Sequence, residues 1–240
     1  MNVLTRLWDQ VYASQPAPPA WVVGVTALAA LLLVLNTASW RLAGKVITIA
    51  HEGGHALVSV LSGRRLEGIR LHTDSSGVTY SRGKRRGPGM VLTAAAGYVT
   101  PPLLGAGAAA LLAARHPAAL LWLALVLLAA TFLAVRNAFG ALAVLVTAAG
   151  VFAVSYYASA AVQGGFAYLA AWFLLLGGMR PALELTRRRR GSRSRSSSRS
   201  GLSDADQLAR LTGVSRGVWV TAFVLIATVA LALGARLLIP

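Results

Sequence analysis

Two histidines and a glutamate stand together in the segment His51-Glu52-Gly53-Gly54-His55. On a helix, residues i and i+4 lie on one face with Cβ atoms about 5 to 6 Å apart, so both imidazoles can bind one metal ion. Glu52 projects about 100° around the helix from His51, because a turn takes about 3.6 residues, and can reach a water on that metal. The pattern predicts His51 and His55 as metal ligands and Glu52 as general base.

An apolar run surrounds this motif at residues 44–63. Ionisable side chains in such a run are costly and usually face an interior cavity or a partner, so a functional site is the first hypothesis. The alternative is a polar cluster that joins helices, with Gly53 and Gly54 allowing close approach. The chain has no cysteine, so any metal must be held by histidine, aspartate or glutamate.

The composition excludes an ordinary soluble globular protein. The 240 residues are 56% hydrophobic and only 12% charged, whereas soluble domains carry about 25% charge. We therefore expect an all-α polytopic membrane protein with about seven transmembrane helices, each near the ~20 residues that a bilayer requires. The expected spans are residues 21–38, 44–63, 89–114, 118–135, 138–156, 164–184 and 217–238.

The chain divides around these spans. Residues 1–20 form an N-terminal tail without an evident cleavable signal peptide, and residues 21–186 form the transmembrane core. Within the core, short alternation across a turn predicts a small membrane-adjacent β-hairpin at about 64–88. A basic Arg/Ser linker at 187–201 is too polar to build a core and is expected to be disordered. Residues 202–240 hold a short helix and the last span.

The basic residues predict the orientation. The net charge is +16, from 23 Lys plus Arg against 7 Asp plus Glu, and most basic residues lie at 64–86 and 180–216. Four expected spans separate these two groups, so both can be cytoplasmic, as the positive-inside rule requires. This predicts a multi-pass protein of the bacterial cell membrane with a cytoplasmic N-terminus and an external C-terminus. The arginines at 187–199 should attract anionic lipid, and no nucleic-acid partner is expected.

The chain resembles the intramembrane zinc metalloproteases of the site-2 protease group, and more closely their bacterial M50B-like branch. The resemblance covers most of the chain and lies in HEGGH, the hairpin LEGIRLHTDSSGVTYSRG, the helix AAAGYVTPPLLG, and the segments RNAFG and SDADQLARLTG. It implies Zn²⁺ as the cofactor and hydrolysis of peptide bonds in membrane-tethered proteins by zinc-activated water. We therefore expect a zinc metalloendopeptidase of the M50B-like type.

A catalytic zinc normally takes three protein ligands plus water. The site-2 protease group supplies an aspartate, usually in an Asp-Gly pair, and this chain has no such pair. Asp204 matches a Ser-Asp-Ala segment that resembles the M50B-like branch, and is the favoured third ligand. Its short helix has an apolar stripe that would let it approach the membrane, formed by Leu208, Leu211 and Val214.

Other third ligands stay open, namely Glu184, Asp206, Asp74 or a water. Ser203 and Asp206 also fit a capping box, which accounts for Asp206 better than for Asp204. Asn137 could hydrogen-bond an oxyanion or be a turn residue at a helix end.

The expected third span and the hairpin have two interpretations each. Glycines and prolines at 97–107 would kink the helix near the site or only pack it against neighbours. The hairpin could pair with an extended substrate by strand addition or form an interfacial lid.

Two other functions remain as alternatives. One is a non-catalytic membrane scaffold, or an inactive protease homologue, that binds client transmembrane helices. The other is a metal transporter, which the scarcity of histidines and acids in the other spans argues against.

Overall fold

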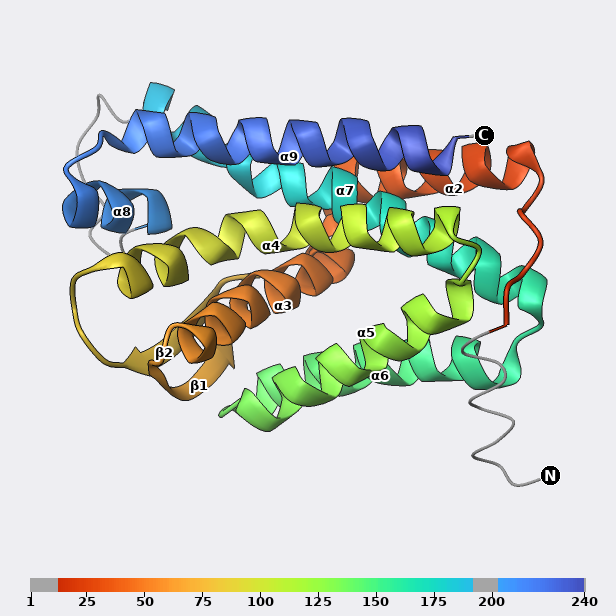
Figure 1. Cartoon of the computed structure of the whole chain (residues 1–240), viewed down its shortest axis with the longest axis horizontal. Coiled ribbons are helices and arrows are strands. Elements are labelled where there is room, and N and C mark those ends of the chain that lie inside the picture. Colours follow the sequence, from red (N-terminus) through yellow and green to blue (C-terminus); the bar gives the residue numbers. More distant parts are fainter. Residues whose placement is uncertain (1–12, 192–202, 240) are drawn as a thin grey trace.

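The apolar runs of the sequence become helices, most of which lie roughly along one axis, with a small sheet at one end (Figure 1). The computed structural model describes residues 13–191 and 203–239. Its helices are α2 (Ala20–Leu35), α3 (Thr37–Leu61), α4 (Pro88–Ala113), α5 (Pro117–Ala134), α6 (Ala138–Tyr157), α7 (Ala160–Gly191), α8 (Asp204–Thr212) and α9 (Arg216–Leu238). The strands are β1 (Arg65–Leu71) and β2 (Gly77–Arg82).

Five helices of the described chain are long and apolar enough to cross a membrane, namely α4, α5, α6, α7 and α9. α2 and α3 pass this test only together, and they are bent by 102°. The Asn36 side chain lies at the break and accepts hydrogen bonds from the backbone N–H groups of Ala38 and Ser39, which caps the start of α3. The described residues therefore offer up to six crossings. The predicted seven are not supported, because the spans expected at 21–38 and 44–63 form one bent pair.

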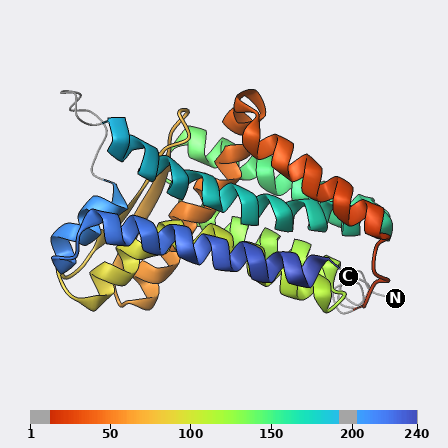
Figure 2. The same ribbon diagram turned by 90° about the horizontal axis from the view of Figure 1, so that it is seen from above.

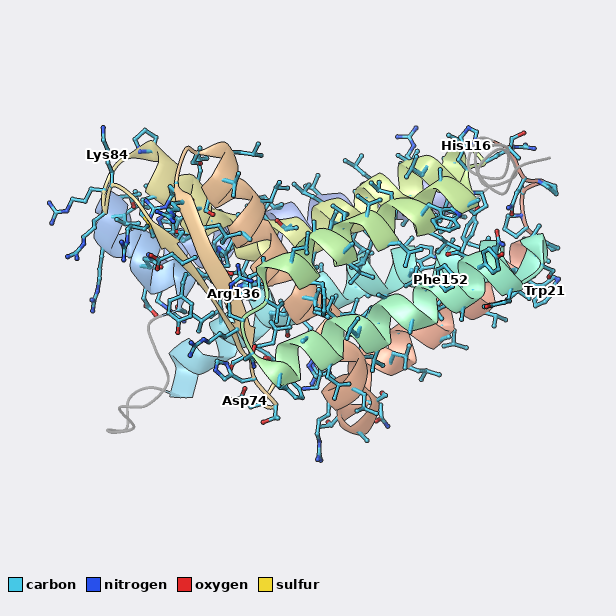
Figure 3. All side chains as sticks on the ribbon, turned by 90° about the horizontal axis from the view of Figure 1, so that it is seen from below. Trp21, Asp74, Lys84, His116, Arg136 and Phe152 are labelled. Carbon is cyan, nitrogen blue, oxygen red and sulfur yellow. The ribbon has the colours of Figure 1, made fainter. Side chains whose placement is uncertain are left out.

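Both ends of the described chain lie at one end of the bundle (Figure 1), as six crossings would require. The backbone N–H of Gln15 donates to the carbonyl of Arg115, between α4 and α5. Leu238 shares a buried cluster with Val23 of α2. The basic segment around Lys84 lies at the opposite end (Figure 3). The structure thus does not support the prediction that the chain starts on the cytoplasmic side of the membrane and ends on the external side. Residues 1–12 lie outside the described part.

α4 runs through the middle of the bundle, between α3 and α9 (Figure 1). A Cβ on Gly54 of α3 would lie 2.6 Å from the Cβ of Thr100 and 3.1 Å from the carbonyl oxygen of Ala96, so only glycine allows this approach of α3 and α4. On the other side α2 packs along α7, as Figure 2 shows from above. α7 continues to Gly191, into the first residues of the expected linker, and residues 192–202 lie outside the described part.

The predicted hairpin is confirmed as an antiparallel pair of β1 and β2. It lies along α3: Lys45 Nζ donates to the carbonyl of Thr73 at 2.8 Å, and Thr48 Oγ1 donates to the carbonyl of Ser75 at 3.0 Å. Ile69 of β1 is fully buried. The hairpin is therefore a packed part of the bundle, attached to the helix that carries the histidines.

The connection between α5 and α6 occupies the second edge of β1. Val135 forms a parallel bridge with Ile69, and the N–H of Arg136 donates to the Ile69 carbonyl at 2.8 Å. The side-chain amide of Asn137 accepts from the N–H of Leu71 and donates to its carbonyl, at 3.1 and 2.8 Å. Asn137 is thus bonded to the hairpin backbone and lies at the start of α6, which favours the alternative of a residue at a helix end over the contact with an oxyanion.

The crossing number can be tested with single cysteines, because the chain has none. Ser14, Lys84 and Ser159 are exposed. In inside-out membrane vesicles, a membrane-impermeant maleimide should label Lys84→Cys but neither Ser14→Cys nor Ser159→Cys until detergent is added. Seven crossings predict instead that Ser14→Cys is labelled together with Lys84→Cys, and that result would exclude the six-crossing arrangement.

Candidate metal centre

Three ligand atoms from two distant segments meet at one point. His51 and His55 lie one turn apart on α3, and Asp204 is the first residue of α8. The Nε2 atoms of the two histidines are 3.2 Å apart, and each is 3.2 Å from Asp204 Oδ2. Two ligands of a tetrahedral zinc at about 2.0 to 2.1 Å from the ion would be about 3.3 Å apart. The triangle therefore has the size that one metal ion requires.

α8 brings Asp204 to the histidines because its apolar face is anchored in the bundle. Ala205 and Leu208 are fully buried, in one cluster with Ala94 of α4 and Phe223 of α9. Burial raises the pKa of Asp204, but hydrogen bonds with His51 and His55 outweigh it and leave the pKa well below the ordinary value. These hydrogen bonds need protons on the two Nε2 atoms, and a bound metal ion would take the place of those protons beside the carboxylate of Asp204.

The other predicted third ligands have different partners. Ser203 and Asp206 form the reciprocal capping box expected from the sequence, and Asp206 also pairs with Arg216 at 3.0 Å. Glu184 pairs with Arg180 at 3.1 Å. Asp74 accepts from Ser76, whose hydrogen bonds lower the Asp74 pKa. Within the part of the chain that the structure describes, only His51, His55 and Asp204 form a cluster of three metal-ligating side chains.

Two histidines lie away from this cluster. His72 Nδ1 is 3.3 Å from the hydroxyl of Ser76, in the turn of the hairpin. His116 is at the opposite end of the bundle from Lys84 (Figure 3). Neither adds a ligand.

The backbone of α4 orients His55. The Nδ1 atom of His55 is 2.7 Å from the carbonyl oxygen of Thr93. A carbonyl only accepts, so Nδ1–H is the donor, and in the neutral ring the Nε2 lone pair then faces His51 and Asp204. A histidine that ligates a metal commonly has such a partner. Sequence reasoning missed Thr93, because a main-chain carbonyl leaves no signal in residue type.

Gly97 of α4 gives the ligand atoms their space. A Cβ at this position would lie 2.3 Å from His55 Nε2 and 2.5 Å from His51 Nε2, so no larger residue fits without displacing the imidazoles. From the sequence, Gly97 was grouped with residues that kink or pack a span. In the structure Gly97 leaves room for the Nε2 atoms of His51 and His55, a role that depends on the contact between α3 and α4.

Glu52 faces the hairpin. Its side chain is 4% exposed, and its Oε2 atom accepts a hydrogen bond of 2.6 Å from Thr79 Oγ1 of β2. A Cβ on Gly77 would lie 2.7 Å from Glu52 Oε1. Sequence reasoning missed Gly77 and Thr79, although the alternation of Gly77, Thr79 and Ser81 on one face of β2 was a signal for a small polar surface.

One comparison with known proteins found a match. The model of the Peptidase M50B-like family matches residues 24–234, a range that contains the three clustered side chains, Glu52 and the hairpin. No match was found among curated proteins or among solved structures.

The ligand set predicts the metal content of the purified protein. His51→Ala and Asp204→Ala should each lose the zinc that the wild type retains at about one ion per chain, because a site with two ligands binds far more weakly. Glu184→Ala is the matched control and should retain it. Full zinc content in Asp204→Ala would exclude Asp204 as a ligand.

A larger side chain at Gly97 tests the position of the metal ion. Gly97→Ala should lose bound zinc while its circular dichroism stays helical, since the new Cβ would overlap both Nε2 atoms. Gly107→Ala on the same helix is the control, because nothing lies within 4 Å of a Cβ there. Equal zinc content in the two variants would contradict the proposed position of the ion.

Proposed function

The chain belongs to the Peptidase M50B-like family, and on this basis we propose that it is an intramembrane zinc metallopeptidase that hydrolyses peptide bonds of membrane-tethered proteins. One observation carries the proposal. Three ligand atoms from α3 and α8 lie 3.2 Å from one another, and a buried glutamate follows the first ligand directly on α3.

The donor set fits zinc. Two imidazole nitrogens and one carboxylate oxygen are a common ligand set of catalytic zinc sites, which keep a further position for water or substrate. His51, His55 and Asp204 would hold the ion, with His55 oriented by the Thr93 carbonyl and Gly97 leaving room beside both rings. A zinc ion bound there would polarise a substrate carbonyl and lower the pKa of a bound water.

Glu52 supplies the proton transfers in this proposal. Its carboxylate would accept a proton from the attacking water and return it to the amine of the leaving peptide, as a general base and then a general acid. Burial keeps Glu52 apart from bulk water, and its position one residue after His51 turns it away from the ligand face by about 100°. The hydrogen bond from Thr79 restricts its rotation.

The free edge of β2 supports an extended substrate. The second edge of β1 is occupied by residues 135–137, whereas no strand of the described chain pairs with the other edge of β2. A substrate strand added there would gain main-chain hydrogen bonds with little demand on its sequence. It would also lie next to Thr79, and so next to Glu52.

The membrane setting follows from the helices and the charges. The candidate spans support a multi-pass protein, in the cell membrane of a bacterium under this proposal. The basic segments at 64–86 and at the end of α7 lie at one end of the bundle (Figure 1). By the positive-inside rule that end faces the cytoplasm, where it would attract anionic lipid.

Replacement of Glu52 tests the function. Glu52→Gln should lower the cleavage rate by about 10² to 10⁴-fold, the usual contribution of a general base, while zinc content stays at the wild-type level. Glu184→Gln is the control acid and should keep full activity. The assay is cleavage of a single-span reporter protein with an unstructured segment beside its transmembrane helix, reconstituted with the enzyme in proteoliposomes.

Two outcomes would contradict the proposal. Equal cleavage by Glu52→Gln and wild type would refute the mechanism. If the wild type cleaves no reporter of this class but retains client transmembrane helices, and Glu52→Gln does the same, the protein is a non-catalytic scaffold.

A further inference from the structure

We propose that Thr79 is a positioning residue for Glu52, so that the hairpin rather than α3 alone sets the direction of the general base. This inference rests on the proposed function, since it assigns a role to a residue beside the proposed base. Nothing in the motif itself points to Thr79, which lies 27 residues after Glu52.

The contact has the geometry of a strong hydrogen bond. Thr79 Oγ1 is 2.6 Å from Glu52 Oε2 and 3.1 Å from the main-chain carbonyl oxygen of Glu52. A threonine hydroxyl has one proton to donate, and the shorter distance assigns that proton to the carboxylate. Bonds to a charged acceptor are shorter and about twice as strong as neutral ones. Thr79 therefore holds one carboxylate oxygen of Glu52.

The same face of β2 confines the carboxylate sterically. Gly77 precedes Thr79 by two residues, so both face α3. A Cβ on Gly77 would lie 2.6 Å from Glu52 Cγ and 2.8 Å from its Cδ, and the Glu52 side chain fits against the strand only because Gly77 has none. A side chain confined in this way has few rotamers left, which is the condition for a well-oriented base.

The strand that carries Thr79 is itself held in place. The hairpin turn is bonded to α3 through Lys45 and Thr48, and β1 is bonded to the connection between α5 and α6 through Asn137. The hairpin that carries Thr79 is thus attached both to α3 and to the α5–α6 connection. The bond from Thr79 occupies Oε2, so in this proposal the other carboxylate oxygen, Oε1, accepts the proton.

β2 would then have two roles, in binding the substrate and in orienting the general base. Its free edge is the proposed substrate edge, and its inner face orients the base. Because β2 would hold both the substrate strand and the Glu52 carboxylate, it would fix the position of one relative to the other.

The test compares two threonines that each attach the hairpin to α3. Thr79→Val removes the bond to Glu52, whereas Thr48→Val removes the bond to the Ser75 carbonyl and does not touch Glu52. Thr79→Val should lower kcat about 10- to 100-fold, the loss expected for one hydrogen bond to a charged group, with KM and zinc content unchanged. Thr48→Val should keep wild-type kcat, and Thr79→Ser should restore it.

A second measurement does not depend on activity. The infrared carboxylate band of Glu52, identified as the band missing in Glu52→Gln, should shift in Thr79→Val but not in Thr48→Val. Where Thr79→Val does not fold, Gly77→Ala displaces the same carboxylate and should give the same shift and the same fall in kcat. An unmoved band, or an equal loss of kcat in Thr48→Val, would overturn the positioning role. A fully active Glu52→Gln would instead overturn the proposed function, so the two failures are distinguishable.

Discussion

The close approach of α3 and α4 is the constraint on which the site depends. Gly54 allows the two helices to meet at Thr100, and Gly97 leaves space for both imidazole nitrogens where a Cβ would be 2.3 to 2.5 Å away. The Thr93 carbonyl contacts His55 Nδ1 and fixes the tautomer of the imidazole. Larger side chains at these two positions would clash with Thr100 or occupy the space of the ligand atoms.

α8 completes the site by hydrophobic anchoring. Ala205 and Leu208 are buried among residues of α4 and α9, and this fixes the position of Asp204 at the start of the helix. The two acids of that first turn have separate tasks, because Asp206 closes the capping box and pairs with Arg216 while Asp204 faces the histidines. The capping box does not use Asp204, which leaves this carboxylate available to a metal.

The hairpin provides the polar partner of the proposed general base, Glu52. It follows the motif in the chain and returns along α3, so that Thr79 of β2 contacts Glu52. The α5–α6 connection closes the opposite side of β1. A general base in a largely apolar bundle needs a polar partner, because an unpaired buried charge is costly, and the small polar face of β2 provides one.

Local features could be predicted from the sequence, and contacts between distant segments could not. His51, Glu52 and His55 follow from the period of one helix. The hairpin and the capping box of α8 follow from turn and cap residues. Asp204 was favoured by resemblance, but only the packing of α8 brings it to His55, 149 residues away. The bend at Asn36 joins two of the expected spans into one bent pair. The roles of Gly97 and Thr79 exist only where α3 meets its neighbours. The spacing of residues shows which side chains share one face of a helix. Which helices then contact each other depends on the close packing of side chains from the whole chain.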